Sequence, residues 1–181
     1  MVVLGSGTIG LATLVAARGQ GARRAVSTDQ GPAKGDIAAR VGADAYVDVL
    51  AAASTVDAVT AAAGGLADVT FVAAGYDGVI DDALAVTRPG GAVVLVSYFE
   101  GRHAVDLNAV VARGISLIGS ALCGPGDLAR AVASLVNGAV DPAVLITHRF
   151  ALNQAQEALE LMVSHGATTG KILLLPAVDR G

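Results

Sequence analysis

Short apolar runs alternate with amphipathic helical segments over most of the chain, and this alternation constrains the fold more than any other feature. Each run has the length of a strand, and each is followed by a segment in which the apolar residues have helical spacing. This alternation predicts an α/β fold: a doubly wound parallel sheet of six main strands with helices on both faces. The expected strands are 1–4, 25–28, 45–49, 69–73, 92–96 and 115–119, and the expected helices between them are 8–18, 32–41, 54–63, 77–87 and 107–112.

The last part of the chain departs from this simple alternation. A helix is expected over 125–137, an extended segment over 144–150, a helix from Asn153 to Ser164, and a final strand over 171–175. Asn153 is expected to cap its helix, with Gln156 placed to return the hydrogen bond. We therefore predict two units, residues 1–145 as the main sheet domain and residues 146–181 as a C-terminal helix and strand.

A glycine-rich loop joins the first strand to the first helix. Gly5, Gly7 and Gly10 have the G-x-G-x-x-G spacing, which is weak evidence alone in a chain with 23 glycines but gains weight between a strand and a helix. Gly5 would allow the tight turn, Gly7 would let the backbone approach a pyrophosphate, and Gly10 would let the helix sit close to the strand. The start of the helix would supply free N–H groups and partial positive charge for the anion. The loop thus indicates a dinucleotide site in a sheet of the Rossmann type.

An acidic residue ends the second strand. Asp29 follows Gly10 by 19 residues, which matches the acid that hydrogen-bonds the adenosine ribose in dinucleotide-binding domains. Its carboxylate would repel a 2′-phosphate, and no arginine occurs at positions 30–34. We therefore expect NAD rather than NADP. Arg23 and Arg24 precede the strand and should lie at its far end.

Two other interpretations of the loop remain open. In one, the glycines serve packing only, and Asp29 is a polar residue before the next helix. In the other, the chain is a methyltransferase, which also binds an adenosine group beside a glycine loop but usually lacks the third glycine at the helix start.

Composition and charge argue against several classes of partner. Hydrophobic residues make up 54% of the chain and charged residues 15%, which predicts a folded core rather than disorder. The net charge is −4 without a basic stripe, so a nucleic-acid partner is not expected. No apolar run approaches the roughly 18 residues of a spanning helix, so a membrane partner is not expected either. The single cysteine, Cys123, excludes an internal disulfide and suits a cytoplasmic location.

Several motifs occur together in an order that is typical of one family. They are the segment 2–11 with its glycine loop, the Asp29–Lys34 stretch, Gly42–Asp44, Arg88–Gly91, Ile146–Phe150 and Gly170–Lys171. In this order they resemble the cofactor-binding (C-terminal) domain of zinc-type medium-chain alcohol, polyol and threonine dehydrogenases over almost the whole chain. The resemblance implies an NAD-dependent oxidoreductase that transfers a hydride between a small alcohol or polyol and NAD.

The resemblance also implies positions for the cofactor. Asp29 would hold the adenosine ribose with Lys34 beside it. Lys171 would reach the pyrophosphate as a point charge, although a solvated lysine before a strand explains this residue nearly as well. The other expected cofactor-binding residues lie in the glycine loop and after the fourth, fifth and sixth strands: Gly5, Ser6, Gly7, Thr8, Ile9 and Gly10, then Ala73, Ala74 and Gly75, then Val96, Ser97 and Tyr98, and finally Ile118, Gly119 and Ser120.

The same resemblance implies that the catalytic residues lie outside this chain. In the family a zinc ion held by cysteine, histidine and carboxylate polarises the alcohol oxygen, and its ligands belong to a preceding domain. Cys123 has no second cysteine, and His103, His148 and His165 fit no ligand spacing. We therefore expect no catalytic and no metal-binding residue here, zinc only through the missing N-terminal domain, and a chain that binds NAD without oxidising alcohols.

Three alternatives stand beside this hypothesis. They are a non-catalytic dinucleotide-binding module, a zinc-free quinone or enoyl reductase of the same superfamily, whose members commonly use NADPH, and a structural protein, which would show no NAD affinity. The resemblance further implies a homo-oligomer joined through the edge strand 115–119. The final strand, 171–175, is expected to lack its strand partner and to expose apolar surface.

Overall fold

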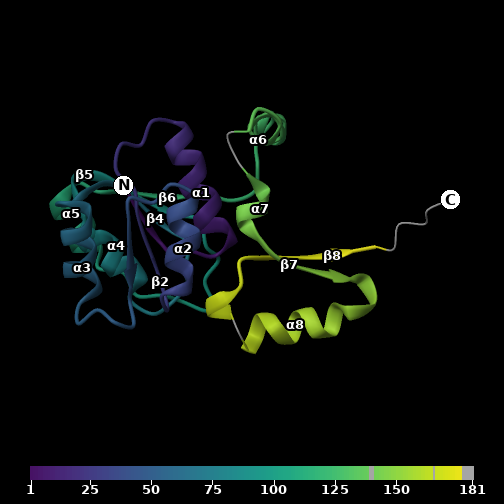
Figure 1. Cartoon of the computed structure of the whole chain (residues 1–181). Helices are drawn as coiled ribbons and strands as arrows, with labels where there is room; N and C mark the ends of the chain where they lie inside the picture. The colour runs from purple at the N-terminus through teal and green to yellow at the C-terminus, as the bar shows by residue number, and fades with distance from the viewer. Residues whose placement is uncertain (139–140, 165, 177–181) are drawn as a thin grey trace.

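The main body of the protein is a six-stranded parallel sheet with the strand order β3-β2-β1-β4-β5-β6. The structure is a computed structural model that describes residues 1–138, 141–164 and 166–176, and Figure 1 shows its arrangement. The strands are β1 (Val2–Leu4), β2 (Val26–Asp29), β3 (Ala45–Asp48), β4 (Ala67–Val72), β5 (Thr87–Leu95) and β6 (Ser116–Gly119). The predicted fold class, including all six strands, is confirmed.

The first strand in the sequence lies at the centre of the sheet. Val2 pairs with Val26 of β2 on one side and with Thr70 of β4 on the other. All three residues of β1 are fully buried. A parallel strand covered on both faces needs such a continuous apolar run, because neither face meets water.

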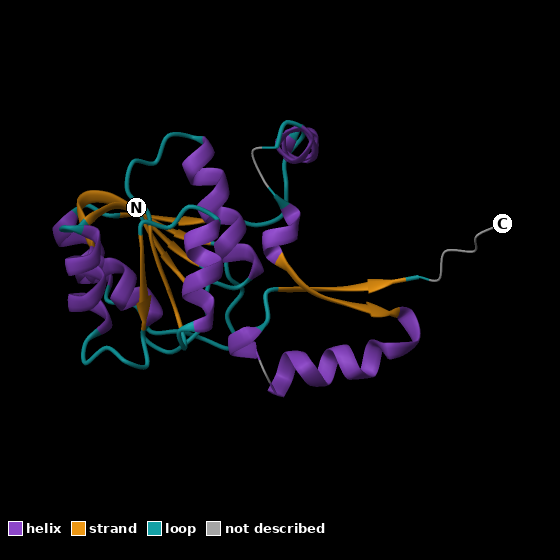
Figure 2. Ribbon diagram, viewed as in Figure 1, coloured by secondary structure: helices purple, strands orange, loops and turns teal. Residues whose placement is uncertain are grey.

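Helices cover both faces of the sheet, as expected, and Figure 2 shows the two layers. Leu11 and Leu14 of α1 and Ile37 of α2 are buried on one face, in clusters that include Val3 of β1. A larger cluster on the other face joins Val2, Leu4, Val72 and Val93 of the sheet to the remaining helices. The helices of this body are α1 (Thr8–Gly19), α2 (Ala33–Arg40), α3 (Thr55–Ala63), α4 (Val79–Val86) and α5 (Leu107–Arg113).

The start of β5 differs from the expectation. Ala67 pairs with Thr87, but the next matched pair is Val69 with Ala92, so the four residues 88–91 of β5 bulge opposite the single residue Asp68 of β4. The expected Arg88–Gly91 turn therefore lies inside the strand, which begins at Thr87 rather than at Ala92. At Gly91 a Cβ would lie 2.8 Å from the carbonyl oxygen of Asp68, so this close approach of two backbones requires glycine.

The rest of the chain forms a smaller, separate layer beside the sheet. Its elements are α7 (Pro142–Leu145), β7 (Ile146–Ala151), the 3₁₀ turn η1 (Leu152–Gln154), α8 (Ala155–Ser164), the 3₁₀ turn η2 (Gly166–Thr168) and β8 (Lys171–Leu175). We call the described residues 141–164 and 166–176 the C-terminal unit. Its two strands pair in parallel, and Figure 1 shows them projecting away from the six-stranded sheet above α8. Between the two parts, α6 (Asp127–Val136) has no buried residue.

Three expectations for this region are corrected by the structure. The final strand β8 has a strand partner, β7, although Leu174 and Leu175 remain 41% and 45% exposed. Val144 and Leu145, expected to be extended, belong to the helix α7, because the Asp141 side chain accepts a hydrogen bond of 2.8 Å from the Ala143 N–H and Pro142 occupies the first helical position.

The third correction concerns the start of α8. Asn153 does not cap it; instead the Gln154 Oε1 accepts a hydrogen bond of 3.0 Å from the Ala151 N–H across η1. Gln156 points along the helix and donates to Glu160. Gln154, one position after Asn153, is the better placed of these two side chains to accept the Ala151 N–H. His165, expected in the last turn of this helix, lies outside the described residues.

No helix within the described residues is long and apolar enough to cross a membrane.

Candidate functional site

The predicted cofactor residues gather along one edge of the sheet. All six strands are parallel, so their carboxyl ends meet at the same edge. The glycine loop follows β1, Asp29 ends β2, and the segments after β4, β5 and β6 continue the row. Ligands of open α/β sheets bind outside this edge, where the strand order reverses. In this sheet the reversal lies between β1 and β4.

Gly5 and Gly10 hold the loop closely against the sheet. Gly5 has a φ of +104°, and a Cβ there would lie 2.8 Å from the carbonyl oxygen of Ala73. At Gly10 a Cβ would lie 1.9 Å from the carbonyl oxygen of Gly5. No side chain fits at either position, so the first and third glycines are required by the approach of α1 to β1 and β4.

Gly7 has a different environment, because nothing lies within 4 Å of the position of its missing Cβ. It is the N-cap residue of α1, which has no side-chain cap and no acidic residue in its first turn. Among the described residues, no hydrogen bond uses the N–H groups of Thr8, Ile9 or Gly10. The helix therefore opens on free space with unpaired donors and its positive dipole end, which is the environment that an anion prefers.

Ser6 ties the loop to the second strand. Its N–H donates to Asp29 Oδ2 at 2.7 Å, and its hydroxyl lies 2.5 Å from that of Ser27 and donates to the Thr28 carbonyl at 3.0 Å. Ser6 is fully buried. Its polar atoms are thus used inside the fold, and the part of the loop that remains open to a ligand is Gly7–Gly10.

The Asp29 carboxylate lies beside the glycine loop and is half-buried. Besides Ser6, its Oδ1 accepts the Gln30 N–H at 2.7 Å. Both oxygens are therefore fixed by backbone donors, and each keeps acceptor capacity for a further hydrogen bond. Arg24 lies far from this edge, because its guanidinium bonds the Ala62 carbonyl at the end of α3.

Lys34 lies in the first turn of α2 and is almost fully buried, at 4% exposure. Its ammonium donates a hydrogen bond to the carbonyl oxygen of Thr169, in the C-terminal unit. Burial lowers the pKa of Lys34, and the nearby Asp29 carboxylate acts against that shift. The family resemblance implies that Lys34 lies beside Asp29, and in the structure the two side chains are close enough to interact through charge.

Asp48 and Tyr46 belong to this corner and were not singled out from the sequence. Asp48 is the register partner of Asp29, and its Oδ1 accepts the N–H groups of Gly31 at 2.9 Å and Leu50 at 3.0 Å. The Tyr46 hydroxyl donates to the Gly31 carbonyl at 2.7 Å. Burial, Asp29 and Asp48 together raise the pKa of Tyr46. Asp48 ends the third strand as Asp29 ends the second. This shared position of an acidic residue is the sequence signal that could have identified Asp48.

The segments after β4, β5 and β6 lie side by side. Ala73 bonds the Leu4 carbonyl at 2.8 Å, and the backbone N–H groups of Val96 and Ser97 both reach the Val72 carbonyl. A Cβ on Gly75 would lie 3.6 Å from the Tyr98 carbonyl oxygen. Ser120 bonds the Leu95 carbonyl at 2.9 Å. The predicted residues Ala73–Gly75, Val96–Tyr98 and Ile118–Ser120 thus border one continuous edge, with the Tyr98 side chain 86% exposed.

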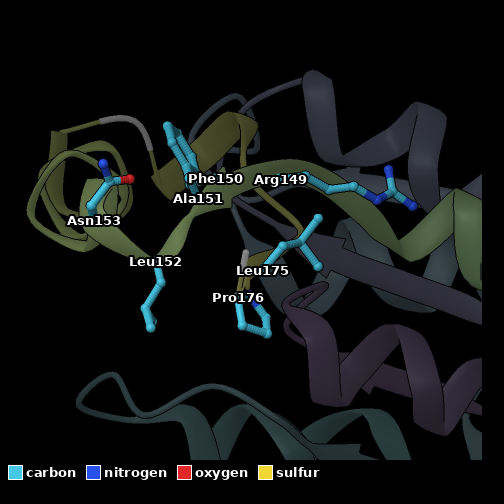
Figure 3. Close-up of a pocket in the computed structure, with 7 residues that line it drawn as sticks. All are labelled: Arg149, Phe150, Ala151, Leu152, Asn153, Leu175 and Pro176. Carbon is cyan, nitrogen blue, oxygen red and sulfur yellow. The ribbon is translucent and has the colours of Figure 1, made fainter. Parts of the chain in front are cut away.

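Lys171 and a hollow lie in the C-terminal unit. Lys171 is the exposed first residue of β8, two positions after Thr169. The hollow is open to solvent, has a volume of about 850 Å³ and lies between the ends of β7 and β8; it is lined by Arg149, Phe150, Ala151, Leu152, Asn153, Leu175 and Pro176 (Figure 3). None of the predicted cofactor residues lines it.

The described residues contain no group of three or more histidine, cysteine, aspartate or glutamate side chains placed to hold a metal ion. Cys123 is exposed after β6. The His103 ring lies 3.7 Å from Asp77 and near Phe99, and His148 bonds the Thr147 hydroxyl. These two histidines therefore have local partners.

Comparison with known proteins agrees with this geometry. Residues 8–137 match the family described as zinc-binding dehydrogenase. The chain is 34% identical over 167 residues to a sorbitol dehydrogenase of Arabidopsis thaliana, covering 86% of this chain and 44% of that protein. It resembles the crystal structure of a 2R,3R-butanediol dehydrogenase from Bacillus subtilis, with a TM-score of 0.83, 27% identity and coverage of 97% of this chain and 50% of that one.

A further similar structure is a putative zinc-binding dehydrogenase from Sinorhizobium meliloti 1021 bound to NADP, with a TM-score of 0.85 and 26% identity, covering 97% of this chain and 52% of that one. The chain spans about half the length of the relatives it matches.

Proposed function

Since the chain belongs to the zinc-binding dehydrogenase family, we propose that it is the NAD-binding portion of an oxidoreductase that transfers a hydride between a small alcohol or polyol and NAD. One observation carries the proposal: the open N-terminus of α1 at Gly7 lies beside the fixed Asp29 carboxylate at the end of β2, and the Ser6 N–H joins the two segments. A dinucleotide presents a diphosphate beside a ribose, which needs these two partners together.

The residues present fit such a cofactor. The free N–H groups of Thr8, Ile9 and Gly10 would hold the pyrophosphate, and Asp29 would accept hydrogen bonds from the adenosine ribose, with Lys34 beside it. Ala73–Gly75 would border the adenosine end, Val96–Tyr98 and Ile118–Ser120 would border the nicotinamide, and Lys171 would reach the pyrophosphate. When bound, NAD supplies the hydride acceptor. The chain's own part is to orient the cofactor and shield one side of it.

We propose NAD rather than NADP because of charge at the ribose. Asp29 and its register partner Asp48 place two carboxylates at the end of neighbouring strands, and a 2′-phosphate would be repelled by both. The relative from Sinorhizobium meliloti was solved with NADP, so cofactor choice differs within the family and has to be decided by these local residues.

We propose that the chain alone binds the cofactor without turning over an alcohol, because the family resemblance implies zinc ligands in a preceding domain and the chain matches only about half the length of its relatives. In the complete oxidoreductase, zinc would be supplied through that domain. A non-catalytic dinucleotide-binding module is the alternative function, and the zinc-free reductases are a second alternative that NADPH preference would favour.

The edge strand β6 provides the proposed contact with a second copy. All four of its residues are exposed, and only one of its sides is paired, with β5. An open strand edge of this kind can pair with an identical edge. Sedimentation analysis of Leu117→Lys beside wild type tests this contact: a dimer that persists in the variant argues against it.

Calorimetric titration of the purified chain with NAD and NADP tests the function. We expect saturable NAD binding, weaker NADP binding, and loss of NAD binding in Asp29→Ala. An alcohol-oxidation assay on the same sample should show no turnover. Absence of NAD binding by a folded wild-type chain overturns the proposal, and measurable turnover overturns its second part.

A further inference from the structure

We propose that Lys34 couples the adenosine end of the cofactor site to the C-terminal unit, so that an occupied site holds this unit more firmly against α2. The proposed tether is the hydrogen bond from the Lys34 ammonium to the Thr169 carbonyl. The coupling half of this inference rests on the proposed NAD function, whereas the tether itself does not.

The two residues are far apart in sequence and buried together. Lys34 donates to Thr169 across 135 positions of the chain. Lys34 is 4% exposed and Thr169 is 6% exposed. A charged hydrogen bond shielded from water is stronger than one at the surface, so this contact contributes to the attachment of the unit.

Apolar contacts also join α7 of the C-terminal unit to α2, but they do not involve residues of the proposed cofactor site. Val144 and Leu145 of α7 pack on the cluster that contains Ile37 of α2. The segment near Thr169 is then fixed on α7 and β7, because Gly170 donates to the Thr147 hydroxyl at 2.9 Å and leaves no room for a Cβ beside the Leu145 carbonyl. Lys34 thus makes a polar contact between α2 and the segment near Thr169. Lys34 also lies near Asp29 of the proposed cofactor site.

The ammonium has unused hydrogen-bonding capacity. A lysine carries three N–H donors, and within the described part of the chain Thr169 is the only hydrogen-bond acceptor of Lys34. Asp29 acts on it through charge. A ribose hydroxyl held by Asp29 would offer the second acceptor, and a buried cation gains from each added partner. Cofactor and Thr169 would therefore share one ammonium rather than compete for it.

The consequence is a positive and reciprocal coupling. If the tether helps to place Lys34 for the ribose, bound cofactor must strengthen the tether by the same factor. The segment that gains protection would be 166–172, which includes Lys171. In this way the adenosine end of the bound cofactor would help to position the Lys171 side chain.

Hydrogen exchange measured by mass spectrometry on the whole chain tests both halves. The variants are Lys34→Met, which removes the donor, Lys34→Arg, which restores one, and Arg40→Met as a matched control at an exposed cationic residue of the same helix. Without cofactor, the peptide covering 166–172 should exchange roughly fivefold to tenfold faster in Lys34→Met and near the wild-type rate in the other two.

With NAD at a concentration that protects the glycine-loop peptide fully, wild type should gain protection at 166–172 and Lys34→Met should not. Lys34→Arg should regain part of it. A structural role alone would change the exchange without cofactor but leave the NAD-dependent gain intact. If Lys34→Met does not fold, Lys34→Leu, which also lacks a donor, serves in its place.

The outcomes separate the two proposals. Unchanged exchange at 166–172 in cofactor-free Lys34→Met overturns the tether, whether or not NAD binds. Protection of the glycine loop by NAD without any gain at 166–172 overturns the coupling. A wild-type chain that shows the tether but no NAD protection anywhere overturns the proposed function, and the coupling with it.

Discussion

The Asp29 carboxylate accepts the Ser6 N–H at 2.7 Å, so the acid proposed for the ribose also anchors the loop proposed for the pyrophosphate. One side chain therefore has two tasks, and its removal has two separable effects. Its charge acts on the cofactor, while its hydrogen bonds act on the loop.

Replacing Asp29 by asparagine separates these effects. Asparagine keeps an oxygen that can accept from Ser6, but it loses the negative charge and the acceptor for the Gln30 N–H. We expect Asp29→Asn to lose only about 0.5–1.5 kcal/mol of stability and to narrow the preference for NAD over NADP by roughly tenfold, or about 1.4 kcal/mol. Asp29→Ala should lose both hydrogen bonds and about 1.5–3 kcal/mol of stability. Paired titrations with both cofactors and urea unfolding measure the two effects; an unchanged cofactor ratio in Asp29→Asn would contradict the charge argument.

The middle and last glycines of the loop, Gly7 and Gly10, exclude side chains for different reasons. In Gly10→Ala the new methyl would lie 1.9 Å from the Gly5 carbonyl oxygen, so we expect a loss of more than about 3 kcal/mol of stability through overpacking. In Gly7→Ala the methyl meets nothing within 4 Å, so stability should change by less than about 1 kcal/mol while NAD affinity falls strongly. Thermal unfolding and calorimetry on both variants test this, and equal effects of the two on stability would argue against the described loop.

Asp44 should make stability depend on pH. The Ala25 N–H, followed by the Arg18 guanidinium, holds the pKa of this carboxyl below its usual range. A carboxyl with a lowered folded pKa contributes stability above its unfolded pKa of about 3.9 and loses it as the pH falls through the folded value. Asp44→Asn should therefore be less stable than wild type at pH 7, and the gap should shrink towards pH 3. Urea unfolding at a series of pH values checks the trend, and a gap that stays constant would show that Asp44 is not the cause.

Arg113 joins the end of α5 to the corner between α4 and β5. Its guanidinium donates to the carbonyl oxygens of Leu84, at 2.5 Å, and Thr87. In Arg113→Met these carbonyls would lose a charged donor, so we expect a loss of about 1.5–3 kcal/mol without change in NAD affinity. Arg102→Met, at an exposed arginine, is the matched control and should be neutral. A change in NAD affinity in Arg113→Met would mean that α5 acts on the site.

The sequence was sufficient to predict the six-stranded body because local signals and burial agree there. Ser54 caps α3 through the Asp57 N–H, Gly64 and Gly114 end α3 and α5 in the left-handed conformation, and the central strand β1 is a continuous apolar run. These signals depend on neighbouring residues only, so reading along the chain finds them.

The parts that sequence reasoning missed depend on distant contacts. The Lys34–Thr169 bond joins residues 135 positions apart, and the bulge at the start of β5 results from the approach of Asp68 to Gly91. At η1, the amide side chains of Asn153 and Gln154 could both accept the Ala151 N–H, and the backbone geometry favours Gln154. No local pattern reports such contacts.

The position of β1 sets an order for how the sheet is made. β1 is synthesised before the other strands of this sheet, yet its neighbour β4 begins at residue 67, after two complete strand–helix crossovers. A sheet with no hairpin in it has no early, local pairing to nucleate on. The newly made β1, fully apolar, must therefore keep one edge unpaired until β4 is synthesised, and in that interval chaperones or misplaced strands can bind this edge.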